Sequence, residues 1–161
     1  MAIDHSRFRQ ALSQFASGIT VVTTRDAAGA PLGLTVSAFC SVSLDPPMVL
    51  VSIDNRSEAG AGLLGSGIFG VSILAEGQED WSRRFASAGP AKFSGVDLLA
   101  GLSGVPLIPG ALAHIECRVA GVYAGGDHTL YLGEVTELEV GEGRPLLYHN
   151  RGYRRLEPEE P

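Results

Sequence analysis

Runs of β-branched and apolar residues alternate with short turn signals along most of the chain. Residues 19–24 form a continuous β-branched run that predicts a strand, and the turn at 26–29 predicts that 32–36 returns beside it as a hairpin partner. Residues 48–53 are apolar almost without alternation, which indicates a strand buried on both faces. Further strands are predicted at 39–44, 68–74, 113–119, 130–140 and 146–148.

Helical patterns occur in a few places between these strands. Phe8, Leu12 and Phe15 stand at helical spacing and predict a helix that Asp4 caps and Gly18 ends. Other predicted elements are a short helix at 58–64 that begins after Ser57 and is closed by Gly65, a helix at 80–88, and a long Gly-, Ser- and Pro-rich loop at 88–110.

The pattern of strands and helices limits the fold class. In 113–119 the apolar residues alternate with His114, Glu116 and Arg118, which predicts a half-buried antiparallel strand, and Gly133 is a candidate β-bulge in 130–140. A doubly wound sheet would need a helix between most strands, and those helices are missing. The pattern therefore predicts a mainly β protein with a few helices, either a small β-barrel or a mixed α+β barrel.

Length and composition agree with one globular unit. A chain of 161 residues with 45% hydrophobic and 19% charged residues is long enough for a single domain and too apolar for disorder. We expect one domain over 1–156, followed by an acidic, proline-broken tail at 157–161 that frays.

Charge and cysteine content exclude several classes of function. The 12 basic residues against 18 acidic ones give a net charge of −6, which argues against a nucleic-acid partner. No apolar stretch is long enough for a membrane span and the first residues lack a signal-peptide pattern, so we expect a cytoplasmic protein. Cys40 and Cys117 lie in apolar runs and are expected to be buried small hydrophobes.

The usual catalytic motifs are absent, and the four histidines show no metal-ligand spacing, so no metal site is predicted. A stripe of hydroxyl side chains remains between 33 and 47, where Thr35, Ser37 and Ser41 can share one face of a strand. These hydroxyls either face solvent on an edge strand or suit a planar heteroaromatic ligand with a phosphate.

Five features in the correct order resemble the flavin reductase-like family of FMN-binding split barrels. Together they cover roughly residues 6–156, so agreement by chance is improbable. They are Gly18-Ile19-Thr20-Val21-Val22-Thr23, the run 33–53, the turn Asn55-Arg56-Ser57, which resembles the family's phosphate-contacting turn, the loop Lys92-Phe93-Ser94-Gly95-Val96, and Gly126-Asp127-His128 followed by 148–153.

The resemblance implies a six-stranded antiparallel split β-barrel that forms a homodimer with flavin at the subunit boundary. It implies an NAD(P)H:flavin oxidoreductase that supplies reduced FMN or FAD to a flavin-dependent monooxygenase. It assigns nicotinamide contacts to His128 and Tyr153. It assigns flavin contacts to Thr35, Val36, Ser37, Ala38, Ser52, Ile53, Asp54, Ser57, Arg84, Phe85, Lys92 and Phe93.

Physical arguments support some of these roles independently. Ser57 precedes a helix whose N-terminus favours an anion, although an ordinary N-cap explains it equally. Lys92 is the only lysine, and His128 is either a turn residue bonded to Asp127 or a donor to the nicotinamide nucleotide. No catalytic side chain is predicted, because the hydride passes from nicotinamide to the flavin N5 and the protein only stacks the two rings.

Two other functions stay open at this point. The chain could be a flavin carrier without turnover, or a split-barrel oxidoreductase that acts on another small molecule. FMN and FAD share the isoalloxazine and the first phosphate, so the sequence does not choose between them. NADH is favoured over NADPH because no basic pair for a 2′-phosphate is evident.

Overall fold

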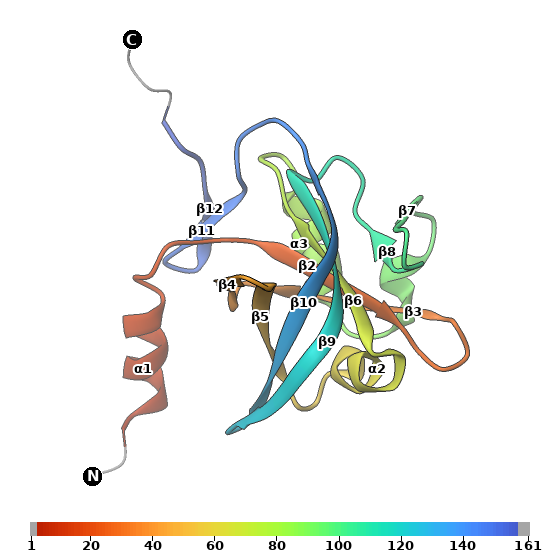
Figure 1. Cartoon of the computed structure of the whole chain (residues 1–161). Helices are drawn as coiled ribbons and strands as arrows, with labels where there is room; N and C mark the ends of the chain where they lie inside the picture. Colours follow the sequence, from red (N-terminus) through yellow and green to blue (C-terminus); the bar gives the residue numbers. More distant parts are fainter. Residues whose placement is uncertain (1–2, 158–161) are drawn as a thin grey trace.

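The computed structural model describes residues 3–157, so the frayed tail predicted at 157–161 lies outside the described residues except for Glu157. Figure 1 shows how the helices and strands of this part of the chain are arranged. The helices are α1 (His5–Leu12), α2 (Glu58–Ser66), α3 (Glu79–Ala86) and the 3-10 helix η1 (Pro90–Phe93). The strands are β1 (Ser17–Gly18), β2 (Thr20–Arg25), β3 (Pro31–Val36), β4 (Phe39–Leu44), β5 (Pro47–Asp54), β6 (Ile68–Ile73), β7 (Leu99–Ala100), β8 (Pro106–Leu107), β9 (Ala113–Gly125), β10 (His128–Val140), β11 (Leu147–His149) and β12 (Gly152–Arg154).

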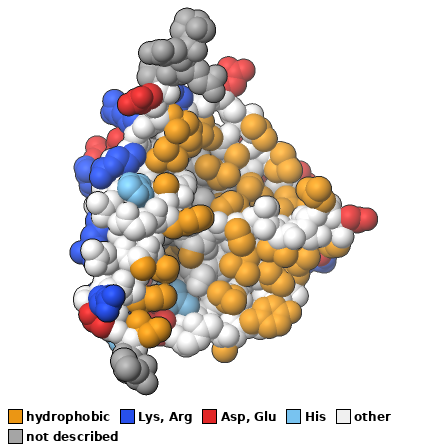
Figure 2. Space-filling view, turned by 90° about the vertical axis from the view of Figure 1, so that its left-hand side faces the viewer, with side chains coloured by type: hydrophobic (Ala, Val, Ile, Leu, Met, Phe, Trp, Pro, Cys, Tyr) orange, Lys and Arg blue, Asp and Glu red, His pale blue; other side chains and the backbone are white. Residues whose placement is uncertain are grey.

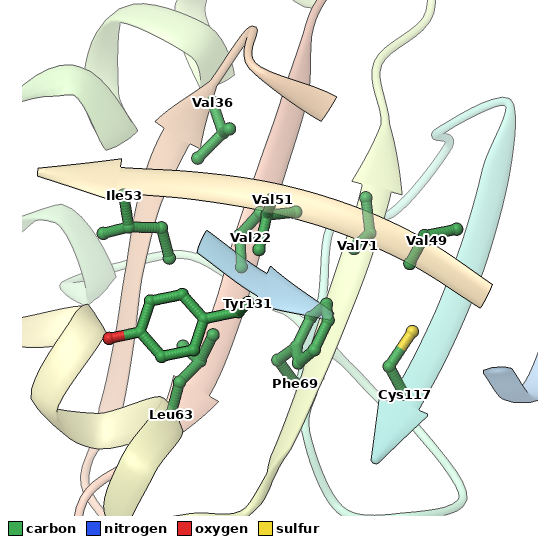
Figure 3. Packing of buried hydrophobic residues seen from close by; sticks show 10 residues of the cluster. All are labelled: Val22, Val36, Val49, Val51, Ile53, Leu63, Phe69, Val71, Cys117 and Tyr131. Carbon is green, nitrogen blue, oxygen red and sulfur yellow. The ribbon is translucent and has the colours of Figure 1, made fainter. Parts of the chain in front are cut away.

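One antiparallel sheet of seven strands dominates the described structure, in the order β3-β2-β6-β9-β10-β5-β4. The sheet curls so that β5 passes across β2 and β6 with the core between them (Figure 3). The mainly β, antiparallel class is therefore confirmed. The predicted number of six strands is wrong for this sheet, because both β3 and β4 pair along their length with a neighbour and extend its two edges.

Two small sheets complete the described strands. β1, β11 and β12 form one of them, which joins the segment after α1 to the C-terminal hairpin. β7 and β8 form a short hairpin inside the segment 88–110, for which the sequence predicts only a loop. The hairpin strands are two residues each, too short to show a period-two pattern.

The curled sheet encloses a hydrophobic core that we call the barrel-interior cluster. Phe69 is completely buried at its centre, and Leu63 of α2 closes one end (Figure 3). Gly133 lies at the predicted β-bulge of β10, where a Cβ atom would stand 2.4 Å from Phe69 Cζ. The cluster consists of Val22, Val36, Val49, Val51, Ile53, Leu63, Phe69, Val71, Cys117 and Tyr131.

A second core, the α3 cluster, lies between the sheet and α3. Phe85 of α3 is buried in it, and the Phe93 ring meets the Phe85 ring edge-on at 5.1 Å. The buried members are Ile19, Val21, Leu74, Phe85, Ile108 and Leu146, and Trp81, Phe93, Leu98 and Tyr153 pack against them.

The three α-helices form where the sequence predicts them, but each of them ends elsewhere: α3 stops at Ala86 rather than at 88. The helix η1 lies in the segment predicted to be a loop. Asp4 caps α1 as expected, because its carboxylate accepts the Ser6 N–H at 2.9 Å. α1 stops at Leu12 rather than at Gly18, and none of its residues is buried, so no tertiary packing extends it. α2 ends at Gly67, which adopts the left-handed conformation, and not at Gly65. No described helix has the length and apolar character needed to cross a membrane.

Burial departs from the sequence pattern on two strands. In β5 only Val49, Val51 and Ile53 are buried, and the other face of the strand is partly exposed. The prediction that both faces of this strand are buried was therefore wrong. In β9 the polar residues His114 and Glu116 are buried as well, because the β7–β8 hairpin covers their face.

Glu116 shows why a carboxylate is tolerated there. It accepts the backbone N–H groups of Leu102 at 2.8 Å and Ser103 at 2.7 Å, and also the Ser103 hydroxyl. Hydrogen bonds of this kind offset the free energy that a buried carboxylate loses when it leaves water. Glu116 therefore anchors the turn of the β7–β8 hairpin.

The two cysteines lie in opposite environments. Cys117 is buried as predicted, and burial raises the pKa of its thiol to about 12. Cys40 is exposed on β4, so the prediction that it is buried was wrong. The reason is that β4 is an edge strand, and its apolar run has no layer over its outer face in the described structure.

Candidate functional site

A cavity of about 630 Å³ opens between β3, the start of α2 and the segment from the end of α3 to η1. Its volume lies in the usual range for small-molecule sites. Backbone of an edge strand forms one wall, and a Pro- and Gly-containing loop forms the opposite one. The lining residues are Pro31, Leu32, Gly33, Leu34, Thr35, Asp54, Arg56, Ser57, Glu58, Ala59, Phe85, Ala86, Ser87, Ala88, Gly89, Pro90, Lys92 and Phe93.

One end of the cavity carries features that suit an anion. Ser57 is the N-cap residue of α2, yet its side chain makes no capping hydrogen bond, so the hydroxyl is not used by the helix itself. Arg56 precedes it and lines the same cavity. A helix N-terminus carries about half a positive charge, and Arg56 adds a full one. Glu58 and Asp54 also line this end, which offsets the positive charge of the cations.

Asp54 and Arg56 form a two-point ion pair. Arg56 Nη2 donates to Asp54 Oδ2 at 2.6 Å, and Arg56 Nε donates to Asp54 Oδ1 at 3.0 Å. The Arg56 guanidinium and the Arg56 backbone N–H hold the pKa of the Asp54 carboxyl well below its usual range. Both side chains are therefore charged at neutral pH.

Lys92 fastens the loop wall of the cavity to the strand wall. Its Nζ donates to the Gly33 carbonyl of β3 at 2.9 Å. Partial burial lowers the pKa of Lys92, and the nearby Glu58 carboxylate opposes that shift. The only lysine of the chain therefore links two walls of the cavity in the described structure rather than extending into solvent.

Thr35 connects the cavity to the predicted nicotinamide residue Tyr153 through α3. The Thr35 hydroxyl donates to the Ser82 carbonyl at 2.6 Å, and the Tyr153 hydroxyl donates to Ser82 Oγ at 3.0 Å. The Arg83 guanidinium lies 5.0 Å from the centre of the Tyr153 ring, and Tyr148 meets that ring at 5.4 Å. Tyr153 is thus held in place by hydrogen-bonding and ring contacts.

His128 stands at the other side of the site, at the beginning of β10. It stands directly opposite Asp54 of the neighbouring strand β5, and Asp54 lines the anion-binding end of the cavity. Its Nδ1 is 2.7 Å from Asp127 Oδ1, and this contact lowers the pKa of the Asp127 carboxyl. The contact matches the turn interpretation of His128 and leaves its Nε2 for another partner.

The structure brings together about half of the predicted flavin residues. Thr35, Asp54, Ser57, Phe85, Lys92 and Phe93 line the cavity. Val36 and Ile53 point into the barrel-interior cluster. The other four are not among the lining residues: Arg84 donates to the Ser94 carbonyl at 2.7 Å, the Ala38 carbonyl accepts from Ser52 N at 3.0 Å, and Ser37 lines a separate groove of about 260 Å³.

Sequence reasoning missed several lining residues. Arg56 was noted only as part of a turn, although a cation directly before a helix N-cap is a signal for an anion site. The loop 86–90 carries no motif, and only its position after α3 makes it a wall. Among the described residues no group of three or more His, Cys, Asp or Glu side chains is placed to hold a metal ion.

Comparison with known proteins adds independent findings. A family model described as "Flavin reductase like domain" matches residues 12–157. The chain is 42% identical over 160 residues to the flavin-dependent monooxygenase reductase subunit HsaB of Rhodococcus jostii. The aligned region covers 99% of this chain and 82% of that protein. The chain is 43% identical over 153 residues to an NADH-dependent flavin reductase of Rhodococcus sp., covering 92% of this chain and 85% of that one.

A solved structure shows that the likeness extends to the whole fold. The NADH:FAD oxidoreductase SgcE6 of Streptomyces globisporus C-1027, in complex with NAD and FAD fragments, superimposes with a TM-score of 0.91 at 38% identity. The superposition covers 97% of this chain and 94% of that chain. The order of strands and helices is thus shared almost from end to end.

Proposed function

The chain belongs to the flavin reductase-like family, and on that premise we propose that it is an NAD(P)H-dependent flavin reductase that passes a hydride from nicotinamide to FMN or FAD. The observation that carries the proposal is the cavity, whose anion-binding end at Arg56 and Ser57 lies beside a wall of strand backbone and hydroxyl groups. Flavin, when bound, supplies the hydride acceptor, and the chain supplies binding and orientation.

The lining residues fit a phosphorylated flavin. Ser57 and the N-terminus of α2 suit the phosphate. Thr35 and the β3 backbone suit the polar edge of a planar ring, and Phe93 offers an apolar surface. Lys92 and the loop 86–90 form the opposite wall of the cavity.

A partner monooxygenase is part of the proposal. The similar proteins include HsaB, named as the reductase subunit of a flavin-dependent monooxygenase, and the named reductase component of 4-hydroxyphenylacetate 3-monooxygenase of Thermus thermophilus. A reductase of this kind releases reduced flavin to a second protein. We favour NADH as donor, because the turn before His128 carries Asp127, which would repel a 2′-phosphate, and no basic pair for that phosphate is evident in the sequence.

We further propose that the chain works as a homodimer. Figure 2 views the side on which α1 lies in Figure 1 and shows apolar side chains gathered over a broad area. Exposed apolar surface of this extent indicates a protein interface. Large hydrophobic side chains are exposed on α1, on β4 and at the end of β10. They are Phe8, Leu12, Val42, Leu44, Leu138 and Val140.

The dimer has a direct test. Sedimentation should give about twice the mass of one chain, which is 16.8 kDa. A monodisperse monomer that reduces flavin at the full rate would count against a shared site.

We also propose one functional domain over 1–156, and a cytoplasmic location because the described cysteines are free thiols and the reaction draws on nicotinamide nucleotides.

The decisive experiment is steady-state oxidation of NADH and of NADPH, followed at 340 nm, with FMN, FAD and riboflavin each in turn. The proposal expects rapid NADH oxidation that depends on added flavin. Flavin binding without NADH oxidation would instead support a carrier. NADH oxidation that needs another small molecule and not flavin would support a different oxidoreductase.

A further inference from the structure

The Asp54–Arg56 pair differs from an ordinary surface ion pair because two donor atoms of one guanidinium meet both oxygens of one carboxylate, at 2.6 and 3.0 Å. The same carboxylate also accepts the Arg56 backbone N–H at 2.9 Å. Three hydrogen bonds therefore link two residues that are separated by one position. They fix both the backbone turn before α2 and the orientation of the Arg56 side chain.

The geometry leaves part of Arg56 free. Nε and one hydrogen of Nη2 are directed at Asp54, so Nη1 and the second hydrogen of Nη2 remain for another acceptor. The Arg56 side chain is 89% exposed and lines the cavity next to Ser57. Without Asp54, a long exposed side chain would sample many rotamers, and binding a ligand would cost the entropy of ordering it.

Asp54 itself is a poor ligand for an anion. Its carboxylate is only 32% exposed, already accepts three hydrogen bonds from Arg56, and would repel a phosphate. The other charged or titratable groups near this end are Glu58 and Lys92 on the cavity wall, and Asp127 and His128 on the adjoining strand end. Arg56 is the cation that the structure orients beside the N-terminus of α2.

We propose that Asp54 is a positioning residue: it orients Arg56 toward the phosphate of the flavin and so sets the preference of the cavity for phosphorylated flavins over riboflavin. This inference rests on the proposed function and deepens it. It reassigns Asp54 from a direct flavin contact to a residue that acts through Arg56.

The test compares the dissociation constants of FMN and riboflavin, measured by the quenching of flavin fluorescence, in wild type, Asp54→Asn, Arg56→Gln and the double variant. Asn keeps the size of Asp54 but cannot accept two donors from a guanidinium in the same way. Arg56→Gln should weaken FMN binding about tenfold and Asp54→Asn about fivefold. Riboflavin binding should change by less than about twofold in both variants.

The double variant gives the sharper result. If Asp54 acts through Arg56, Asp54→Asn should cause no further loss of FMN affinity in the Arg56→Gln background. Glu134→Gln is the matched control, because Glu134 pairs with Arg118 at 2.8 Å on β9 and β10 outside the cavity lining. This control should leave both flavin affinities unchanged.

Three results would overturn the inference. Tighter FMN binding in Asp54→Asn would show that the carboxylate only repels the phosphate. Equal losses for FMN and riboflavin would show that Asp54 contacts the ring or supports the fold. Independent, additive losses in the double variant would show that Asp54 does not act through Arg56. In each case wild-type NADH oxidation with flavin would still decide the proposed function separately.

Discussion

The barrel-interior cluster and the α3 cluster are both hydrophobic, but they adjoin different parts of the molecule. The first is mostly aliphatic and is enclosed by strands of the large sheet, which supply all of its side chains except Leu63 of α2. The second is bounded by aromatic rings, of which Phe93 lines the cavity and Tyr153, a predicted nicotinamide contact, donates to Ser82 of α3.

This difference between the two clusters indicates which residues contribute mainly to stability and which also contribute to ligand binding. A change inside the barrel should unfold the chain without altering which ligand the folded protein prefers. A change at a partly buried ring that packs against the α3 cluster should cost less stability and act on ligand binding, because Phe93 also forms part of the cavity wall. The predictions below test this contrast, beginning with the largest expected effect.

Phe69→Ala should give the largest loss of stability, about 3–5 kcal/mol in the free energy of unfolding, because it opens a cavity in a fully buried site. Urea unfolding followed by fluorescence measures it. The folded fraction should keep its preference for FMN over riboflavin. A loss below about 1.5 kcal/mol would mean that the barrel interior relaxes around the cavity and would weaken the contrast.

His128→Ala should separate function from stability, since His128 belongs to neither cluster. If His128 donates to the nicotinamide nucleotide, loss of that bond is worth about 1.5–3 kcal/mol. The value of kcat/KM for NADH should then fall roughly tenfold to a hundredfold, mostly through KM. Flavin affinity should stay within about twofold.

The control for this prediction is His5→Ala, which removes an exposed histidine of α1. If His128→Ala abolishes flavin binding and leaves the KM for NADH unchanged, His128 belongs to the flavin site or to the fold. If neither value changes, its contact with Asp127 is its whole role, and the nicotinamide site must be sought near Tyr153.

Phe93→Ala should have an intermediate effect on stability, about 1–2 kcal/mol, because its ring is only partly buried and loses the edge-on contact with Phe85. Flavin affinity should fall several-fold at the same time, since Phe93 lines the cavity. Unfolding curves and fluorescence titrations of the same preparation test both values. An unchanged flavin affinity would remove Phe93 from the site.

The smallest effect concerns the thiols and needs no substitution. A thiol reagent should modify Cys40 under native conditions and leave Cys117 unmodified, since burial raises the pKa of Cys117 to about 12 and keeps it protonated. Cys117 should react only after unfolding. Equal rates for the two thiols in the native protein would show that the barrel interior opens readily.

Local features of the chain could be predicted from the sequence because short-range chemistry decides them. Asp4 caps α1, the hairpin of β2 and β3 turns at 26–29, and Gly133 lies at a bulge, since each depends on neighbouring residues or on a period of two. The sequence did not predict where α1 ends, because the helix lacks tertiary packing that would extend it. It did not predict the burial of Glu116 either, because that depends on hydrogen bonds from the distant β7–β8 hairpin.

The candidate site also combines features that the local sequence determines with features that only tertiary contacts determine. The order of motifs along the chain was enough to indicate the family, because it requires only residue types in sequence. The sequence by itself thus determined the mainly β class, the strand and turn positions and the family resemblance. Only the tertiary structure decided the cavity: Lys92 meets Gly33 across 59 positions, and Tyr153 meets Ser82 across 71. No local pattern specifies such pairs, because they arise when the curled sheet brings its edge strand against α3 and the following loop.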